Sequence, residues 1–230
     1  AESVLNDGDV LLSVEGHDVA DDGTVDFRDR ERTSVSYYIQ AHQIGDKLPL
    51  VVLRDGKPQA LIVTLSRPLE QDWLVPNNQY DVLPRYYIFG GIVFCPLSVD
   101  YLKSWGQNWY DDAPQELIAV LGFNYITDER DEVVLAQKVL AAPVNQGYQD
   151  FSNWVVAEVD GKKIRNLEEL VELVETNSDP FVVFKNKWGQ QIVLDREKTR
   201  ETQPQILETY RIPKDRSPDL KNDQEAHPVH

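Results

Sequence analysis

The sequence predicts an α/β protein of the α+β kind, with two related modules in which short strands surround a helix. Residues 14–19 (VEGHDV) and 159–164 (VDGKKI) share one pattern, which is a strand end, an acidic residue with glycine as a turn, and a short return strand. A helical pattern and a strand–turn–strand pattern follow both copies. The chain has 230 residues, 41% of them hydrophobic, which suffices for one or two domains with their own cores.

Charge and composition argue against several classes of function. The chain has 39 Asp and Glu but only 23 Lys and Arg, a net charge of −16, whereas nucleic acid and anionic membranes attract clustered Lys and Arg. No apolar run approaches the roughly 18 residues of a membrane-spanning helix. The single cysteine, Cys95, cannot form an internal disulfide, and no Cys/His spacing fits zinc. We therefore expect no nucleic-acid partner, membrane span, metal or cofactor.

The first segment, residues 1–67, predicts two strands, a helix and a hairpin. An apolar run at 10–14 follows an Asp/Gly turn and predicts a strand. Apolar side chains at helical spacing predict a helix within residues 28–43. Strands at 48–54 and 59–66 flank Asp55-Gly56, which suits a two-residue hairpin turn.

The middle of the chain is rich in aromatic residues and turns. We expect residues 68–85 to be a linker and residues 86–212 to form the second module with an elaborated insertion. Two apolar runs within 86–94 are joined by Gly90-Gly91, which predicts two strands and a tight turn. The other expected elements of the insertion are helices at 97–105 and 114–122 and a buried strand at 132–140.

The last segment repeats the order of the first. Asn166 predicts the N-cap of a helix at 167–176, whose apolar stripe comprises Leu167, Leu170, Val171 and Val174. The elements expected around this helix are a strand at 154–159, a turn at Asp160-Gly161, a hairpin at 181–194, a final helix at 198–212 and a flexible polar tail at 213–230.

Several motifs carry a resemblance to one protein family. They are GDVLLSVEG at 8–16, GTVDFR at 23–28, GD at 45–46, LRDGK at 53–57, GGIVF at 90–94, VNQGY at 144–148 and IPKDRS at 212–217. Together they resemble the PDZ domains of HtrA/Deg (protease Do-like) serine proteases. The second half is most similar to the plant organellar and nuclear Deg proteases and their bacterial relatives. The resemblance covers about residues 4–220 and implies two PDZ modules, each a small partly open β-barrel with capping helices.

The resemblance also implies what lies outside the chain. In that family a trypsin-like protease domain precedes two PDZ domains, but no Gly-Asn-Ser-Gly-Gly motif occurs here, so we expect no catalytic residue in this chain. The first module lacks the loop and strand expected ahead of Leu5, so we expect it to be truncated at its N-terminus. There is no methionine, even at position 1, so we expect a processed chain or a piece of a longer protein.

By resemblance the chain is the non-catalytic PDZ region of a serine endopeptidase. The expected partners are peptides or unfolded protein substrates, the missing N-terminal protease domain, and further copies in a trimer-based homo-oligomer. The expected compartment is a bacterial periplasm or a plant organelle. The alternative is a stand-alone PDZ scaffold with no protease attached, and the sequence encoded upstream distinguishes the two.

The predicted binding residues follow from the mechanism of a PDZ groove. A peptide adds as an extra strand between a strand edge and a helix, and backbone N–H groups of an apolar-Gly-apolar loop hold its terminal carboxylate. The residues expected to do this are Ile88, Phe89, Gly90, Gly91, Ile92 and Phe94, with Leu170 and Val174. Two other interpretations stay open: Gly90-Gly91 makes only a tight turn with its neighbours in the core, or the groove is filled by another part of the chain or by a neighbouring subunit.

Overall fold

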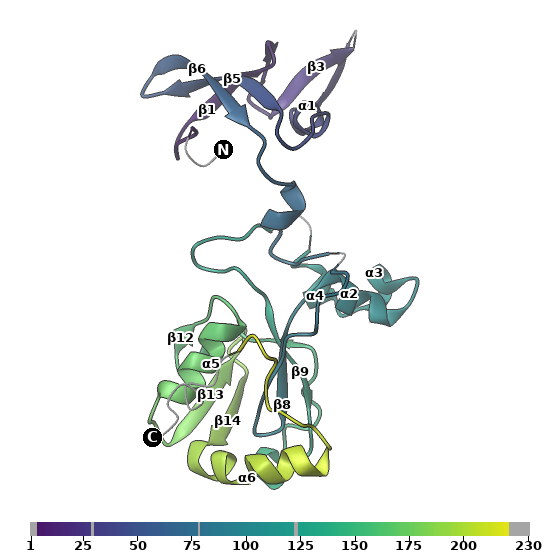
Figure 1. Ribbon diagram of the computed structural model, residues 1–230, viewed down its shortest axis with the longest axis vertical. Coiled ribbons are helices and arrows are strands. Elements are labelled where there is room, and N and C mark those ends of the chain that lie inside the picture. Colours follow the sequence, from purple (N-terminus) through teal and green to yellow (C-terminus); the bar gives the residue numbers. More distant parts are fainter. Residues whose placement is uncertain (1–3, 29, 78, 122–123, 221–230) are drawn as a thin grey trace, which may run out of the picture. The chain divides into compact units, whose positions relative to one another are not determined.

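The computed structural model describes residues 4–28, 30–77, 79–121 and 124–220 (Figure 1). The chain divides into two compact units, residues 1–71 and 72–230. This boundary lies inside the segment predicted as a linker. Residues 72–85 belong to the second unit, where Leu74 and Val75 are buried.

The first unit is built on one antiparallel sheet with the strand order β2-β1-β5-β6. Its strands are β1 (Val10–Val14), β2 (His17–Asp18), β5 (Lys47–Arg54) and β6 (Lys57–Thr64). Both connecting turns, Glu15-Gly16 and Asp55-Gly56, have positive φ at both residues, which is the geometry that matches the twist of a two-residue hairpin. The predicted strands and hairpin are therefore confirmed.

The predicted helix within residues 28–43 is wrong for most of its length. Helix α1 covers only Ser36–Gln40, and the residues before it form β4 (Glu31–Ser34), which pairs with β3 (Thr24–Arg28). Arg32 stabilises this hairpin by donating hydrogen bonds to the Asp26 carboxylate and to Thr24 Oγ1. Since β4 is polar on both faces, it lacks the alternation by which a strand is recognised in a sequence.

His42 should make the stability of the first unit depend on pH. Its Nε2 lies 2.9 Å from Glu15 and its Nδ1 3.5 Å from Asp46. The hydrogen bond with Glu15 raises the pKa of His42 above 6.5, against a smaller opposing effect of desolvation. A raised pKa in the folded state stabilises that state below the unfolded pKa of about 6.5, and this stabilisation is lost as the pH rises through the raised value.

We therefore expect residues 1–71 to be more stable at about pH 6 than at about pH 8.5. Urea unfolding of this unit, followed by NMR amide signals from β1 and β5, measures the difference. The variant His42→Asn should show a much smaller pH dependence over the same range. An equal dependence in both proteins would show that another group is responsible.

The second unit contains two four-stranded sheets that are not closed into a barrel. One has the order β10-β9-β8-β7, and the other has the order β12-β11-β13-β14. The strands are β7 (Tyr87–Phe89), β8 (Ile92–Pro96), β9 (Val134–Val139), β10 (Trp154–Val155), β11 (Glu158–Val159), β12 (Lys162–Lys163), β13 (Phe181–Lys185) and β14 (Gln191–Asp195). The second sheet repeats the strand order of the first unit, as expected for a duplicated module.

The segment 154–159 was predicted as one strand, but the structure divides it between the two sheets. β10 pairs with β9, and β11 pairs with β13. The change of sheet occurs at Val156 and Ala157, whose N–H groups donate to Val134 and to Lys185 respectively. The mostly apolar segment 154–159 does not reveal this change, because buried residues occur in both of its halves, Trp154 and Val155 in β10 and Val159 in β11.

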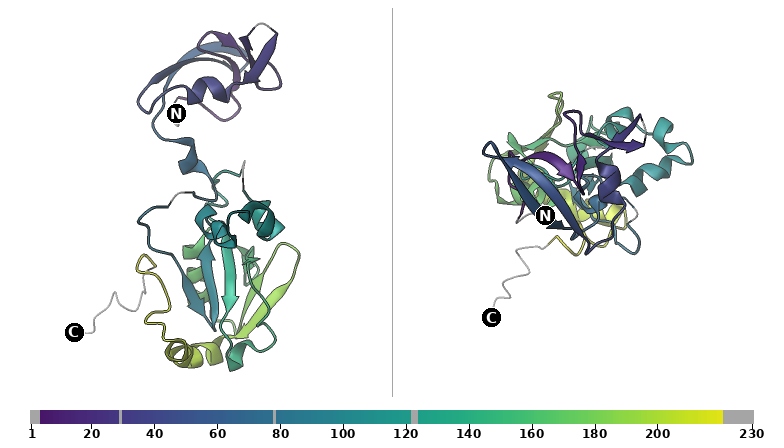
Figure 2. Two further views of the ribbon diagram at one scale, coloured as in Figure 1. Left: turned by 90° about the vertical axis from the view of Figure 1, so that its right-hand side faces the viewer. Right: turned by 90° about the horizontal axis from the view of Figure 1, so that it is seen from above.

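Helices cover the ends of these sheets (Figure 2). Helix α6 (Arg196–Thr209) crosses one end, and short helices inserted between β8 and β9 lie at the other. The remaining helices are α2 (Val99–Leu102), α3 (Trp109–Asp112), α4 (Gln115–Ile118) and α5 (Leu167–Thr176), with 3-10 turns η1 (Leu69–Asp72), η2 (Lys103–Trp105) and η3 (Pro143–Asn145). The predicted cap of α5 is confirmed, because Glu169 N–H donates to Asn166 Oδ1 at 2.9 Å.

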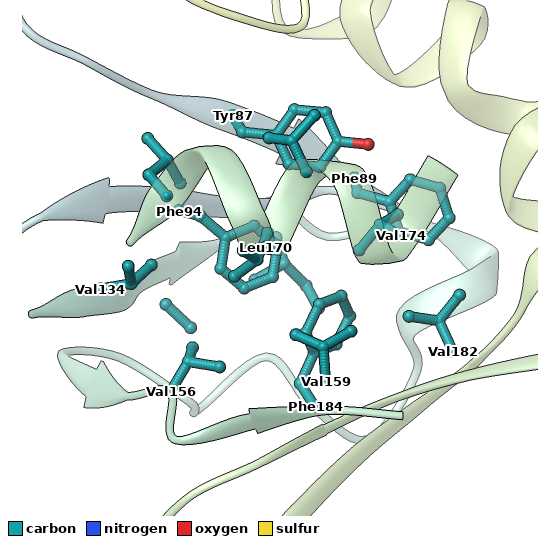
Figure 3. Close-up of a cluster of buried hydrophobic side chains, with 14 of the residues drawn as sticks. Tyr87, Phe89, Phe94, Val134, Val156, Val159, Leu170, Val174, Val182 and Phe184 are labelled. Carbon is teal, nitrogen blue, oxygen red and sulfur yellow. The ribbon is translucent and has the colours of Figure 1, made fainter. Parts of the chain in front are cut away.

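The main core lies between α5 and the two sheets (Figure 3). Phe94 of one sheet and Phe184 of the other are fully buried, with their ring centroids 4.7 Å apart. Leu170 and Val174 of α5 are also fully buried in this core. Burying one such side chain is worth about 1.5–3 kcal/mol relative to leaving it exposed. The packing of Phe94, Phe184, Leu170 and Val174 is therefore a large favourable contribution to the folding of this unit.

Candidate functional site

The candidate binding loop is the turn between β7 and β8. Gly90 and Gly91 have φ of 58° and 84°. Residues other than glycine adopt these backbone angles only with strain. A Cβ on Gly90 would lie 2.6 Å from the Leu194 side chain, and one on Gly91 would lie 2.4 Å from the Leu140 carbonyl oxygen. The two glycines are therefore required by the tight turn and by the close packing around it.

Side chains of the same chain already bind the polar groups of this loop. Gly90 N–H donates to Gln203 Oε1 at 3.0 Å, while Gln203 Nε2 donates to the Ile88 carbonyl at 2.6 Å. The amide of Gln203 thus bonds to β7 as the backbone of an added strand would. On the other side, Asn145 Nδ2 donates to the carbonyls of Gly90 and Leu140, both at 2.7 Å. A ligand carboxylate reaches Gly90 N–H only if it displaces Gln203.

The strand after the loop has no free edge. β8 pairs with β7 on one side and with β9 on the other. All eight residues predicted to bind peptide are buried, and they are Ile88, Phe89, Gly90, Gly91, Ile92, Phe94, Leu170 and Val174. Six of them place their side chains in the interior of the unit, and Gly90 and Gly91 form the turn between β7 and β8.

The outer edge of β7 is covered by residues near the C-terminus. Tyr87 forms an antiparallel bridge with Arg216. Ile88 N–H donates to the Asp215 carbonyl at 2.7 Å, and Ser217 N–H donates to the Tyr86 carbonyl at 2.9 Å. We call residues 214–217 the edge segment. The flexible tail predicted from residue 213 therefore does not begin there, although residues 221–230 lie outside the described residues.

Arg216 connects the edge segment to helix α5. Its guanidinium forms an ion pair with Glu175 of that helix and lies 5.1 Å from the centre of the Tyr87 ring. Arg216 and Ser217 are 7% and 1% exposed. A buried, charge-assisted hydrogen bond is stronger than one between neutral groups, so Arg216 contributes much of the attachment of this segment.

Burial raises the pKa of the Cys95 thiol to about 12, which keeps it protonated and unreactive. No group of three or more His, Cys, Asp or Glu side chains among the described residues is placed to hold a metal ion. No described helix is long and apolar enough to cross a membrane.

Four residues around the loop and its strand were missed in the sequence analysis, and they are Asn145, Gln203, Arg216 and Ser217. Asn145, Arg216 and Ser217 lie in motifs that carried the family resemblance, at 144–148 and 212–217, but only the tertiary contacts reveal what they do. Gln203 lies in a largely polar helix, where no pattern distinguishes it from its neighbours.

Comparisons with known proteins identify the family of this chain. The family model described as PDZ domain matches residues 75–219. Protease Do-like 4, mitochondrial, of Arabidopsis thaliana is 34% identical over 91% of this chain and 37% of its own length. From the same organism, Protease Do-like 2, chloroplastic, is 33% identical over 96% of the chain and 35% of its own length, and Putative protease Do-like 13 is 33% identical over 97% and 41%.

The chain thus spans between about a third and two-fifths of the length of these relatives. The PDZ model covers most of the second unit, including the edge segment and both sheets. The relatives extend the similarity over most of the first unit as well. The chain therefore belongs to the HtrA/Deg family of Do-like proteases, and its residues 75–219 form a PDZ domain.

Proposed function

We propose that the chain is the non-catalytic PDZ region of a Deg-type serine endopeptidase, that it binds extended peptide or unfolded protein segments, and that it helps to assemble a trimer-based oligomer. In the same proposal residues 1–67 are part of a first PDZ domain. The observation that carries the binding role is the edge segment itself. It lies on β7 beside α5 as an added strand, which is how PDZ domains bind peptides.

A ligand at this edge competes with the edge segment. Main-chain hydrogen bonds to Tyr86 and Ile88 supply affinity for any extended chain, because they do not depend on sequence. Glu175 and the Tyr87 ring add a preference for a basic side chain at the position of Arg216. The domain accordingly binds other segments when residues 214–217 leave β7.

The test compares the full chain with a variant that ends at Ile212. The probe is a fluorescein-labelled peptide with the sequence of residues 212–220, and fluorescence anisotropy measures its binding. We expect the truncated variant to bind the probe and the full chain to bind it at least about tenfold more weakly, since its own segment competes. Reduced and carboxymethylated α-lactalbumin should displace the probe.

A second peptide, with alanine at the position of Arg216, is the matched control and should bind at least about tenfold more weakly than the probe. Circular dichroism first establishes that the truncated variant is folded. A folded variant that binds neither the probe nor the unfolded protein would contradict the binding role. Sedimentation velocity of the full chain tests assembly, and a monomer at all concentrations would contradict that part of the proposal.

A further inference from the structure

A second surface of the PDZ unit has the features of a binding site, and it does not involve β7. The helices inserted between β8 and β9 pack against the chain that precedes β7. Between them lies a pocket of about 210 Å³, lined mainly by Trp73, Val75, Val99, Trp109, Val120 and Leu121. Pockets for small molecules and cofactors usually measure about 300–1,000 Å³, so this one suits a single large side chain of a partner.

Apolar surface continues beside the pocket. Trp73 forms a β-bridge with Tyr125, and Ile126 N–H donates to the Asp72 carbonyl at 2.8 Å, so both residues lie next to the pocket wall. Tyr125 and Ile126 are 42% and 45% exposed, and Tyr110, next to Trp109, is 59% exposed. Contiguous exposed apolar surface with a polar border is typical of protein interaction sites.

The surroundings of the pocket are strongly acidic. Residues 72–132 contain ten Asp and Glu but three Lys and Arg, a net charge of −7. Asp72 precedes Trp73, Asp100 follows Val99, and Asp111 and Asp112 follow Trp109, so carboxylates adjoin the pocket-lining residues in the chain.

The three cations of this segment are already engaged. Lys103 pairs with Asp100 at 3.0 Å, and Arg85 pairs with Glu132 and Asp219. Arg130 donates to the Glu132 carbonyl at 3.1 Å. Arg165, outside the segment, also pairs with Asp131 at 3.0 Å. The exposed Asp111 and Asp112 beside Trp109 are therefore the carboxylates best placed to attract a partner that brings its own positive charges.

We propose that this pocket binds a basic segment of another protein, which inserts one leucine- or phenylalanine-sized side chain against Trp73 and Trp109 and places flanking Lys or Arg side chains near the carboxylates. Aromatic side chains in such pockets usually supply most of the binding energy. A basic segment fits this pocket better than a second copy of this chain does, since a second copy would bring a net charge of −16 to the same acidic surface.

The probe for this test is the fluorescein-labelled peptide acetyl-Gly-Lys-Arg-Phe-Leu-Lys-Arg-Gly-amide, titrated with the full chain. Two control peptides carry Ser-Ser in place of Phe-Leu, or Glu in place of every Lys and Arg. We expect both controls to bind at least about tenfold more weakly than the probe. Binding of the probe should also weaken when NaCl rises from about 50 to about 300 mM, because salt screens the charge pairs.

Two variants of the chain locate the site. Trp109→Ala removes one wall of the pocket and should weaken binding at least about tenfold. The double variant Asp111→Asn/Asp112→Asn should weaken it at least about threefold, and since both residues are exposed it keeps the fold intact. The matched controls are Trp188→Ala, an exposed tryptophan on the β13–β14 turn, and Glu197→Gln/Glu201→Gln on α6, which changes the net charge equally. Neither should change the affinity by more than about twofold.

Three results would overturn the proposal. One is equal binding of the acidic and basic peptides. Another is equal loss of affinity in the Asp111/Asp112 and Glu197/Glu201 variants, which would indicate attraction by net charge alone. The third is self-association that Trp109→Ala abolishes, because the pocket would then hold a second copy. The probe lacks a free carboxylate and is tested on the chain with its edge segment in place, so a failure at β7 leaves this result unaffected.

Discussion

Replacing Gly91 by alanine is expected to destabilise the PDZ unit by about 3 kcal/mol or more. The new Cβ would lie 2.4 Å from the Leu140 carbonyl oxygen and 2.6 Å from Asn145 Nδ2. Neither atom moves easily, since Leu140 N–H donates to the Gly91 carbonyl and Nδ2 of fully buried Asn145 donates to the Gly90 and Leu140 carbonyls. The φ of 84° adds backbone strain to this overlap.

Gly189→Ala is the matched control, because Gly189 has the same φ of 84° but nothing within 4 Å of the added Cβ. It should cost only the backbone strain, about 1–2 kcal/mol. Urea unfolding followed by tryptophan fluorescence measures both, since all five tryptophans lie in residues 72–230. Equal losses in the two variants would mean that packing around the loop contributes nothing.

Replacing Arg196 by methionine is expected to cost about 3–5 kcal/mol, the usual effect of removing one partner from a buried ion pair. Arg196 is 3% exposed and pairs with Asp160 at 2.7 Å. Its guanidinium also donates to the carbonyls of Val174, Asp179 and Phe181. One side chain thus links the start of α6 to the end of α5 and to the turn after β11, and methionine replaces none of these bonds.

Arg200→Met is the control for the loss of one arginine on the same helix. Arg200 is exposed and donates one hydrogen bond, to the Glu175 carbonyl, so the cost should stay below about 1 kcal/mol. The double variant Arg196→Met/Asp160→Asn should be less destabilised than the sum of the two single variants, because each single change leaves the other group charged without its counter-ion. Full additivity would show that the pair is not coupled.

Local interactions account for the elements that were predicted correctly. The turns Glu15-Gly16, Asp55-Gly56 and Asp160-Gly161 all have positive φ at both residues, a geometry that Asp-Gly favours and for which glycine suits the second position of all three turns. Helix α5 follows from its apolar stripe and from the cap at Asn166. These signals lie within a few residues of the element they specify.

Local sequence patterns do not predict whether the residues around Gly90-Gly91 line a peptide groove. The sequence correctly indicated two strands around Gly90-Gly91, but whether their residues face a groove or a core depends on what packs against them. Gln203 lies 113 residues from Gly90 in the chain, and Ser217 lies 131 residues from Tyr86. A pattern of neighbouring residues in the sequence cannot predict contacts between residues that lie so far apart in the chain.

The sequence by itself determined the α/β class, the duplicated strand–turn–strand and helix pattern, and the family, because turn geometry, side-chain periodicity and short sequence motifs are local properties of the chain. Only the tertiary structure decided that β8 is paired with a strand on each side, that the outer edge of β7 is covered, and that the polar residues 214–217 form the ordered edge segment that covers it. Their order comes from hydrogen bonds to Tyr86 and Ile88 and from the pair of Arg216 with Glu175. Such a segment has no apolar pattern of its own, so its structure exists only when the distant strand supplies the other half of each bond.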